Sequence, residues 1–253
     1  MKITKQTIDV LQNFSNINKS ILVEPDSELE TMSPDKSILA WSSIDEIFPQ
    51  HFEIYDVKEF LRVLTSPAFV SITEDIRDAE IEFGEEYLTL VNGDFSSKYF
   101  YAAEGIVVKP KKVGMPEPEI SFSLDKNKLN SVFSMASILD KDDLVVTSDG
   151  ETISVVVLDK KNNTSNDFRV VVGAGNGDTY TIYLKTENIK VLMGSYDVTI
   201  SSEGISHFSN QEIDLEYWIT TEPDSEFNKS VVVLGDEEPE VEEPVSGQRI
   251  PPR

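Results

Sequence analysis

Short segments in which apolar and polar residues alternate make up most of this chain, and they constrain its fold more than any other feature. An alternating segment fits a strand with one face on a core and the other face in water. The pattern therefore predicts antiparallel sheets throughout the chain. The segments are residues 21–24, 37–43, 69–73, 86–91, 98–103, 120–124, 144–148, 152–158, 168–173, 178–184, 196–201 and 215–220.

Four other segments carry helical periodicity, with apolar residues recurring along one side of a helical wheel. The two pairs of segments are offset by about half the chain, which indicates a duplicated unit. We therefore expect an α+β fold of two similar domains, residues 1–108 and 119–228, each with two helices packed on antiparallel sheets. The helical segments are residues 4–17, 56–65, 125–139 and 186–193.

Two stretches lie outside these domains. Residues 106–119 contain three prolines and three lysines, which predicts an exposed and extended connector, placed at residues 109–118. Residues 236–243 hold six acidic residues within a stretch that has no apolar periodicity. The sequence therefore predicts an acidic, disordered tail over residues 229–253.

The composition excludes several classes of site. The chain has no cysteine, so disulfides, thiolate zinc sites and a cysteine nucleophile are excluded. Its two histidines, His51 and His207, are far apart in sequence and lack the spacing of metal ligands or of a catalytic triad. We expect no enzyme activity, no cofactor and no metal. The N-terminus lacks the apolar run of a secretory signal and no membrane-spanning segment is present, so a cytoplasmic protein is expected.

The formal net charge of −24 argues against a broadly positive surface for nucleic acid. The charge is nevertheless unevenly distributed. The four helical segments with their flanks hold nine basic and five acidic residues, whereas the rest of the chain holds 13 and 41. Lysine and arginine favour helices over strands, and this preference alone would give such a partition. The functional interpretation is that the helices line a channel around DNA and contact phosphates without reading bases.

Extended stretches of the sequence resemble one protein family. LQNFSNINKSI (11–21) and SSIDEIFPQHFEIYDVKEFLRVL (42–64) are similar to the first domain of the sliding clamps of T-even bacteriophages. GDTYTIYLKTENIKVLMGSYDVTIS (177–201) and YWITTEPDSEF (217–227) resemble the closing strands and C-terminus of that family. Departures occur around residues 65–120, where this chain is longer, and after residue 227.

The resemblance implies a DNA clamp fold assembled as a homotrimer, a ring of six domains with the helices inside. It implies a processivity factor without catalytic residues, which encircles double-stranded DNA topologically and independently of sequence. The family is loaded by an ATP-driven clamp loader, binds the C-terminal peptide of the phage DNA polymerase, and in T-even phages also activates late transcription. The expected location is the cytoplasm of the infected bacterial host. The residues expected to face DNA are Lys5, Gln12, Lys19, Lys58, Arg62, Lys126, Lys128 and Lys190.

The resemblance also implies an apolar groove for the partner peptide beside the connector. These side chains could instead only seal the connector against the second domain. A different class of function also stays open, an acidic β-rich structural protein or a DNA-mimicking interaction protein, for which the overall charge would be the function. The predicted groove residues are Val107, Val108, Met115, Pro116, Tyr217 and Ile219.

Overall fold

The computed structural model describes residues 1–70, 79–111, 114–162 and 164–228. Its helical elements are α1 (Lys5–Ile17), α2 (Val57–Leu64), α3 (Lys126–Leu139) and the 3₁₀ turn η1 (Thr186–Asn188). The strands of the first half are β1 (Ile21–Val23), β2 (Glu28–Met32), β3 (Ile38–Ser43), β4 (Phe52–Ile54), β5 (Glu80–Phe83), β6 (Tyr87–Asn92) and β7 (Phe95–Phe100). The strands of the second half are β8 (Ile120–Leu124), β9 (Asp143–Asp149), β10 (Thr152–Leu158), β11 (Phe168–Ala174), β12 (Thr179–Lys185), β13 (Tyr196–Ser201), β14 (Ile205–Asn210), β15 (Leu215–Thr220) and β16 (Glu226–Asn228).

The order of elements repeats a unit of one strand, one helical element and three strands. The unit occurs as β4-α2-β5-β6-β7, as β8-α3-β9-β10-β11 and as β12-η1-β13-β14-β15. The first unit, α1-β1-β2-β3, has the N-terminal residues in place of its leading strand. Met1 and Ile81 exchange two backbone hydrogen bonds there, of 2.9 and 2.7 Å. The internal duplication expected from the sequence is thus present at the level of these units.

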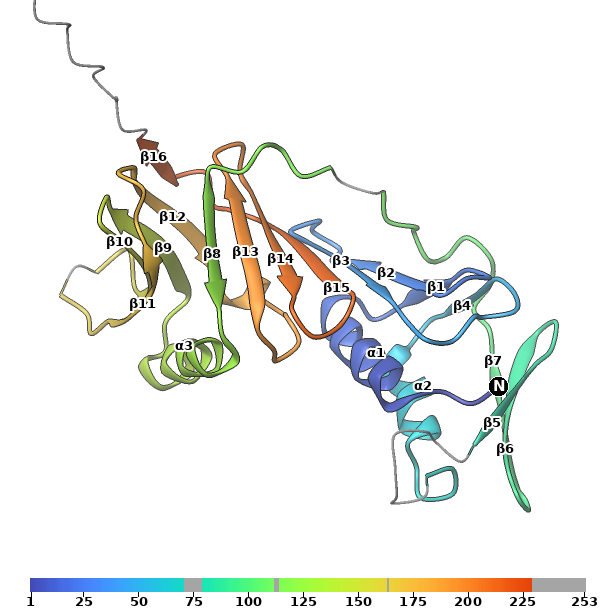
Figure 1. The fold of residues 1–253 in the computed structure, drawn as a ribbon. Coiled ribbons are helices and arrows are strands. Elements are labelled where there is room, and N and C mark those ends of the chain that lie inside the picture. The colour runs from blue at the N-terminus through green and yellow to red at the C-terminus, as the bar shows by residue number, and fades with distance from the viewer. Residues whose placement is uncertain (71–78, 112–113, 163, 229–253) are drawn as a thin grey trace, which may run out of the picture.

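The strands form three sheets in which every pairing is antiparallel, as expected. An eight-stranded sheet of order β4-β1-β2-β3-β15-β14-β13-β8 runs through both halves of the chain. A three-stranded sheet (β5-β6-β7) lies at one end of the molecule and a five-stranded sheet (β11-β10-β9-β12-β16) at the other (Figure 1). All three α-helices lie on one side of the eight-stranded sheet, and the chain between β7 and β8 runs along the opposite side, here called the outer face (Figure 1).

Alternation along the strands explains why this sheet has a core side and an outer face. In β15, Leu215, Tyr217 and Ile219 are buried toward the helices, whereas Glu216 and Trp218 face outward and are only partly buried. Cross-strand pairs share a face, so Trp41, the partner of Glu216, and Leu39, the partner of Trp218, also lie on the outer face. The side chains of Trp41 and Trp218 therefore point to the outer face.

The two halves meet where β3 pairs with β15, with Ile38–Ser42 opposite Leu215–Ile219. A buried polar network joins the halves beneath that pairing. The amide of Asn13 in α1 donates to the Lys190 carbonyl at 2.9 Å and accepts from the Tyr217 hydroxyl at 2.7 Å. The same hydroxyl accepts from the Leu192 amide at 3.0 Å. Its burial raises the pKa of Tyr217 well above the usual range, so the hydroxyl stays a neutral donor.

The prediction of a fourth helix over residues 186–193 is wrong. Only Thr186–Asn188 form a 3₁₀ turn, and the chain then continues without helix to Gly194. Ile189 and Val191 are buried by this extended path. The network around Asn13 and Tyr217 takes the backbone groups of residues 190 and 192, which an α-helix would need for its own hydrogen bonds.

Helix and strand positions otherwise follow the sequence patterns closely, with some omissions. The strands β2, β4, β5, β14 and β16 were absent from the predicted set. In β2, which reads ELETM, only Leu29 is a large apolar residue on the core side, so the alternation is weak. Of the predicted strand 69–73, residues 69 and 70 are not in a strand and the remainder lies outside the described residues, as does the tail 229–253.

The network predicts a large effect of one buried amide. Replacing Asn13 by Leu leaves the Tyr217 hydroxyl and the Lys190 carbonyl without their partner, and should lower the free energy of unfolding by about 2–3 kcal/mol. Asn16→Leu, on the exposed side of the same helix, is the control and should change it by less than about 0.5 kcal/mol. Urea unfolding measures both. Strict additivity of Asn13→Leu with Tyr217→Phe would contradict the shared network.

Candidate nucleic-acid interface

Helices α1 and α2 lie against each other and leave a polar groove between their exposed sides. We call it the helix groove, lined by Gln12, Ser15, Asn16, Lys58, Leu61, Arg62 and Thr65, with Lys19 and Asp56 in the adjoining hollow. Four of the eight residues predicted to face DNA, Gln12, Lys19, Lys58 and Arg62, are thus brought together from two separate segments. The cations among them can attract phosphates, a contact that is independent of base sequence.

Helix periodicity places these side chains. In α1, the burial of Leu11 and Phe14 leaves Gln12 and Asn16, four residues apart, on the opposite side. In α2, the burial of Phe60 and Leu61 leaves Lys58 and Arg62 exposed at the same spacing. The start of α2 is set by Asp56, whose carboxylate accepts the Glu59 amide at 2.9 Å.

The cations of the helix groove differ in how closely they are paired with carboxylates. Lys19 lies 3.4 Å from the Asp56 carboxylate and 4.5 Å from the centre of the Tyr55 ring, so its charge is partly satisfied. The hydrogen bond from the Glu59 amide, with a smaller contribution from Lys19, holds the pKa of Asp56 below its usual value. Among the described residues, no ion pair joins Lys58 or Arg62 to a carboxylate. These two side chains are therefore available to attract a phosphate.

Helix α3 presents a different surface. Its N-cap Asp125 accepts the amides of Asn127 and Lys128 at 3.0 and 2.9 Å. The exposed side carries amides and hydroxyls, and residues 126–139 include no acidic residue. Beside its two lysines, this stretch offers neutral hydrogen-bond donors to a phosphate backbone. The exposed polar residues are Lys126, Asn127, Asn130, Ser131, Ser134 and Ser137.

The remaining predicted cations are spread out. Lys5, at the start of α1, is exposed and pairs with Asp9. Lys128 is half-buried, 3.8 Å from Asp125, and Lys190 is half-buried in the segment after η1. Lys5 and Lys128 belong to helices on one side of the sheet (Figure 1), and the Lys190 backbone is bonded to Asn13 of α1 on that side. The structure therefore places the predicted residues on one side of the molecule but gathers only those of the helix groove into one cluster.

The residues predicted for a partner groove do not form one surface. Tyr217 and Ile219 are wholly buried on the core side of β15, so no peptide can reach them from the outer face. Val107 is buried, Val108 is 75% exposed, and Met115 and Pro116 are half-buried. Assigning Tyr217 and Ile219 to an exposed groove was wrong, because alternate residues of a strand point to opposite faces and these two point to the core.

A different apolar set lies on the outer face. Its members occupy adjacent strands where the two halves meet, and we call them the outer strip: Met32, Leu39, Trp41 and Trp218. Trp218 also stacks on His207, with ring centres 4.9 Å apart. The sequence held the signal for this set, because Leu215, Tyr217 and Ile219 form the apolar series of β15 and leave Trp218 on the other face.

Other kinds of site find no support in the described part of the chain. Within residues 1–70, 79–111, 114–162 and 164–228, no group of three His, Asp or Glu side chains is arranged to hold a metal ion. Among the helices that the structure describes, none combines the length and apolar content needed to cross a membrane.

No family model matches the chain. Its curated relatives are nevertheless all named sliding clamps. The sliding clamp of Vibrio phage KVP40 is 31% identical over 231 residues, covering 88% of this chain and 99% of that protein. The sliding clamp of Escherichia phage RB69 is 24% identical, covering 89% and 98%. Among solved structures, A. fulgidus PCNA bound to the C-terminal region of FEN-1 superposes with a TM-score of 0.66 at 14% identity, covering 89% and 98%. The PCNA2–PCNA3 complex of Sulfolobus tokodaii gives 0.65 at 9%, covering 87% and 99%.

Proposed function

The chain belongs to the sliding-clamp family, and from this premise we propose that it encircles duplex DNA and tethers the phage DNA polymerase for processive replication. The observation that carries the proposal is the partition of the molecule by the eight-stranded sheet. The acid-poor sides of α1, α2 and α3 lie on one side, and the connector crosses the other (Figure 1). Such a molecule can hold DNA on its helix side while its outer face stays free for proteins.

Contact with DNA in this proposal is electrostatic and independent of sequence. Lys58 and Arg62 attract phosphates with release of counterions, and the hydroxyls and amides of α3 add neutral hydrogen bonds. The attraction is weak for each subunit, because most of the charge of the chain is negative. A closed ring needs no strong attraction, since it is retained on DNA by topology.

The proposed ring would close through the edge strands at the two ends of the molecule. The edge strand β7 of the three-stranded sheet and the edge strand β11 of the five-stranded sheet lie at opposite ends, and each has one unpaired edge within the described structure. Both carry exposed apolar side chains, Phe95 and Phe100 on β7 and Val171 on β11. Because the two edges differ, their pairing is head-to-tail, which generates a closed ring at a suitable angle. We propose a homotrimer of six domains.

The chain supports a division into clamp domains 1–108 and 119–228, linked by the connector 109–118. The repeated units fall two on each side of that connector. The acidic tail 229–253 stays a prediction from the sequence.

The outer strip is the proposed surface for the polymerase. Aromatic side chains that are partly exposed anchor peptides efficiently, and Trp41 and Trp218 are diagonal neighbours across the β3–β15 pair. The solved A. fulgidus clamp is bound to the C-terminal region of FEN-1, which supports a terminal peptide as the kind of ligand. Met115 and Pro116 of the connector would close over it. The clamp loader, and activation of late transcription, would use the same outer face in the cytoplasm of the infected host.

Topological retention gives the first test of this function. Clamps loaded by the phage loader should stay on circular DNA through gel filtration and be lost when the circle is cut. Lys58→Glu with Arg62→Glu should reduce loading and make the dependence on salt less steep, while the subunits remain assembled. Lys36→Glu with Lys161→Glu changes the same charge at exposed sites outside the helices and should have little effect. Equal retention on cut and intact circles would contradict encirclement and favour an acidic protein of another class.

The assembly prediction concerns mass. Sedimentation equilibrium at micromolar concentration should give three times the 28.4 kDa of one chain. Phe100→Asp on β7 and Val171→Asp on β11 should each produce monomers that stay folded, because both side chains are exposed in the single chain. A wild-type chain that sediments only as a monomer would refute the ring.

The partner prediction concerns Trp218 of the outer strip and Met115 of the connector. Trp218→Ala with Met115→Asp should weaken binding of a peptide with the polymerase C-terminal sequence by at least about tenfold. Tyr55→Ala removes an exposed aromatic residue from outside the outer strip and serves as the control. Fluorescence anisotropy measures affinity and sedimentation checks the ring. Unchanged affinity in an intact ring would place the peptide elsewhere.

A further inference from the structure

One buried carboxylate is not used by any step of the proposed function. Glu53 lies in β4 opposite Leu22 of β1, on the outer face of the sheet, and is only 2% exposed. Burying a carboxylate without hydrogen-bond donors costs several kcal/mol, so its surroundings must compensate the charge.

The hydrogen-bond donors to Glu53 are backbone amides at the beginning of the segment that links the two halves. The Glu53 carboxylate accepts the Gly105 amide at 2.6 Å and the Val107 amide at 2.8 Å. Its backbone carbonyl accepts the Ala102 amide at 2.8 Å. We call residues 105–107 the connector root. Gly105 has φ of 84°, which turns both amides toward the same carboxylate, and Val107 is buried beside it.

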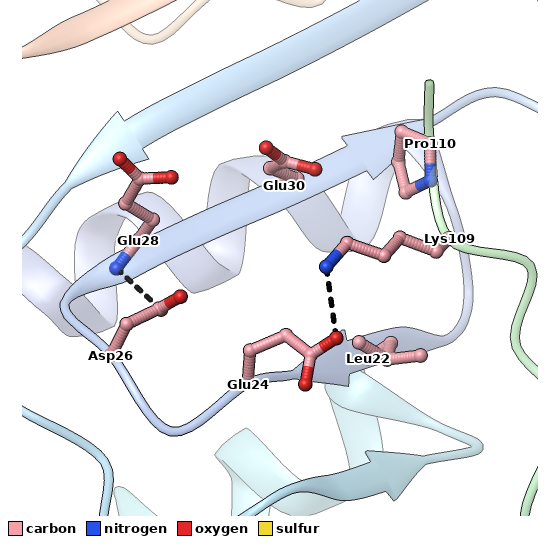
Figure 2. A pocket seen from close by; sticks show the side chains of 7 residues that line it. All are labelled: Leu22, Glu24, Asp26, Glu28, Glu30, Lys109 and Pro110. Carbon is pink, nitrogen blue, oxygen red and sulfur yellow. Dashed lines mark hydrogen bonds and ion pairs between the residues drawn. The ribbon is translucent and has the colours of Figure 1, made fainter. Parts of the chain in front are cut away.

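A second contact holds the chain just beyond the root. Figure 2 shows Lys109 reaching over β1 to Glu24, with Nζ and carboxylate oxygen 2.9 Å apart. This pair raises the pKa of Lys109 and lowers that of Glu24, which His51 also contacts at 3.1 Å. The Lys109 side chain is 57% exposed, so water and salt screen the pair. Glu53 is therefore the principal attachment.

The far end of the connector is held in the same way by another glutamate. The Glu119 amide donates to the Ile200 carbonyl at 3.1 Å, and its carboxylate accepts the Ser202 amide and hydroxyl at 2.8 and 2.6 Å. The connector thus has a fixed point at each end, one on β4 and one beside β13. The described residues between these points, 108–111 and 114–118, lie on the face that carries the outer strip (Figure 1).

We propose that Glu53 is a positioning residue for partner binding, and that by fixing the connector root it sets the path on which Met115 and Pro116 close over a peptide on the outer strip. The inference rests on the proposed peptide site. Without the carboxylate, the root amides lose a shared acceptor and the connector adopts many paths. A peptide must then order the connector as it binds, and its affinity falls.

The test uses full-length variants of the assembled ring. Glu53→Gln keeps the shape of the side chain but leaves only one acceptor oxygen for the amides of Gly105 and Val107. Hydrogen exchange at Gly105 and Val107 should accelerate, and affinity for the polymerase C-terminal peptide should fall about fivefold. Retention on circular DNA and the trimer mass should not change. Glu53→Asp, which keeps the charge on a shorter side chain, should recover part of the affinity.

Matched variants separate positioning from loss of charge. Glu24→Gln removes the charge that contacts Lys109 and His51, and Glu203→Gln removes an exposed carboxylate on the β13–β14 turn, so both should change affinity less than about twofold. Faster exchange at the root with unchanged peptide affinity would overturn the proposal and leave the peptide site standing. No binding by the wild-type ring would overturn both. If Glu53→Gln fails to assemble, Glu53→Asp carries the same two measurements, and unchanged affinity with faster exchange there overturns the proposal.

Discussion

The pairing of β3 with β15 is the interaction on which the rest of the structure depends. It joins strands almost 180 positions apart in sequence into one sheet, and that sheet separates the helices from the connector. Backbone pairing alone would allow the strands to slip, and a slip of one residue would move Tyr217 to the outer face. The Asn13–Tyr217 hydrogen bond prevents this, because only one register brings the hydroxyl to the α1 amide. Specificity of register is thus set by a neutral polar contact inside an apolar core.

The acidic residues of the chain are distributed unequally between the two sides of the eight-stranded sheet. Glu28, Glu30 and Glu216 occupy outward positions, whereas the helical segments with their flanks hold nine basic and five acidic residues. A net charge of −24 repels DNA, and the repulsion is weakest at the helices, where basic residues outnumber acidic ones. The charge therefore does not conflict with membership of a DNA-encircling family, because it restricts where DNA can lie.

Much of the fold could be predicted because local patterns and the final structure agree. Alternation located most strands, and the Asp56 and Asp125 caps mark helix starts that the structure repeats. The prediction of a fourth helix was wrong because backbone groups of that segment bond with Asn13 and Tyr217. These residues are remote in sequence, and no local pattern reveals their contacts. The prediction that Tyr217 and Ile219 line a partner groove was wrong for a different reason. The alternation of β15 already fixed which side Trp218 faces, but choosing Tyr217 and Ile219 ignored it. The role of Glu53 was out of reach, since a glutamate in a short strand gives no sign of burial until the connector is seen to cover it.

The serine and asparagine surface of α3 has a consequence for motion along DNA. A lysine that leaves one phosphate for the next must recondense and release ions at each step, which roughens the energy profile of translocation. A hydroxyl or amide exchanges one hydrogen-bond acceptor for another, or for water, at nearly constant free energy. With DNA against the helix side as proposed, the hydroxyls and amides of α3 would add little friction to sliding. Friction would then arise mainly from the cations on the helix side, which include Lys126 of α3 as well as Lys58 and Arg62 of α2.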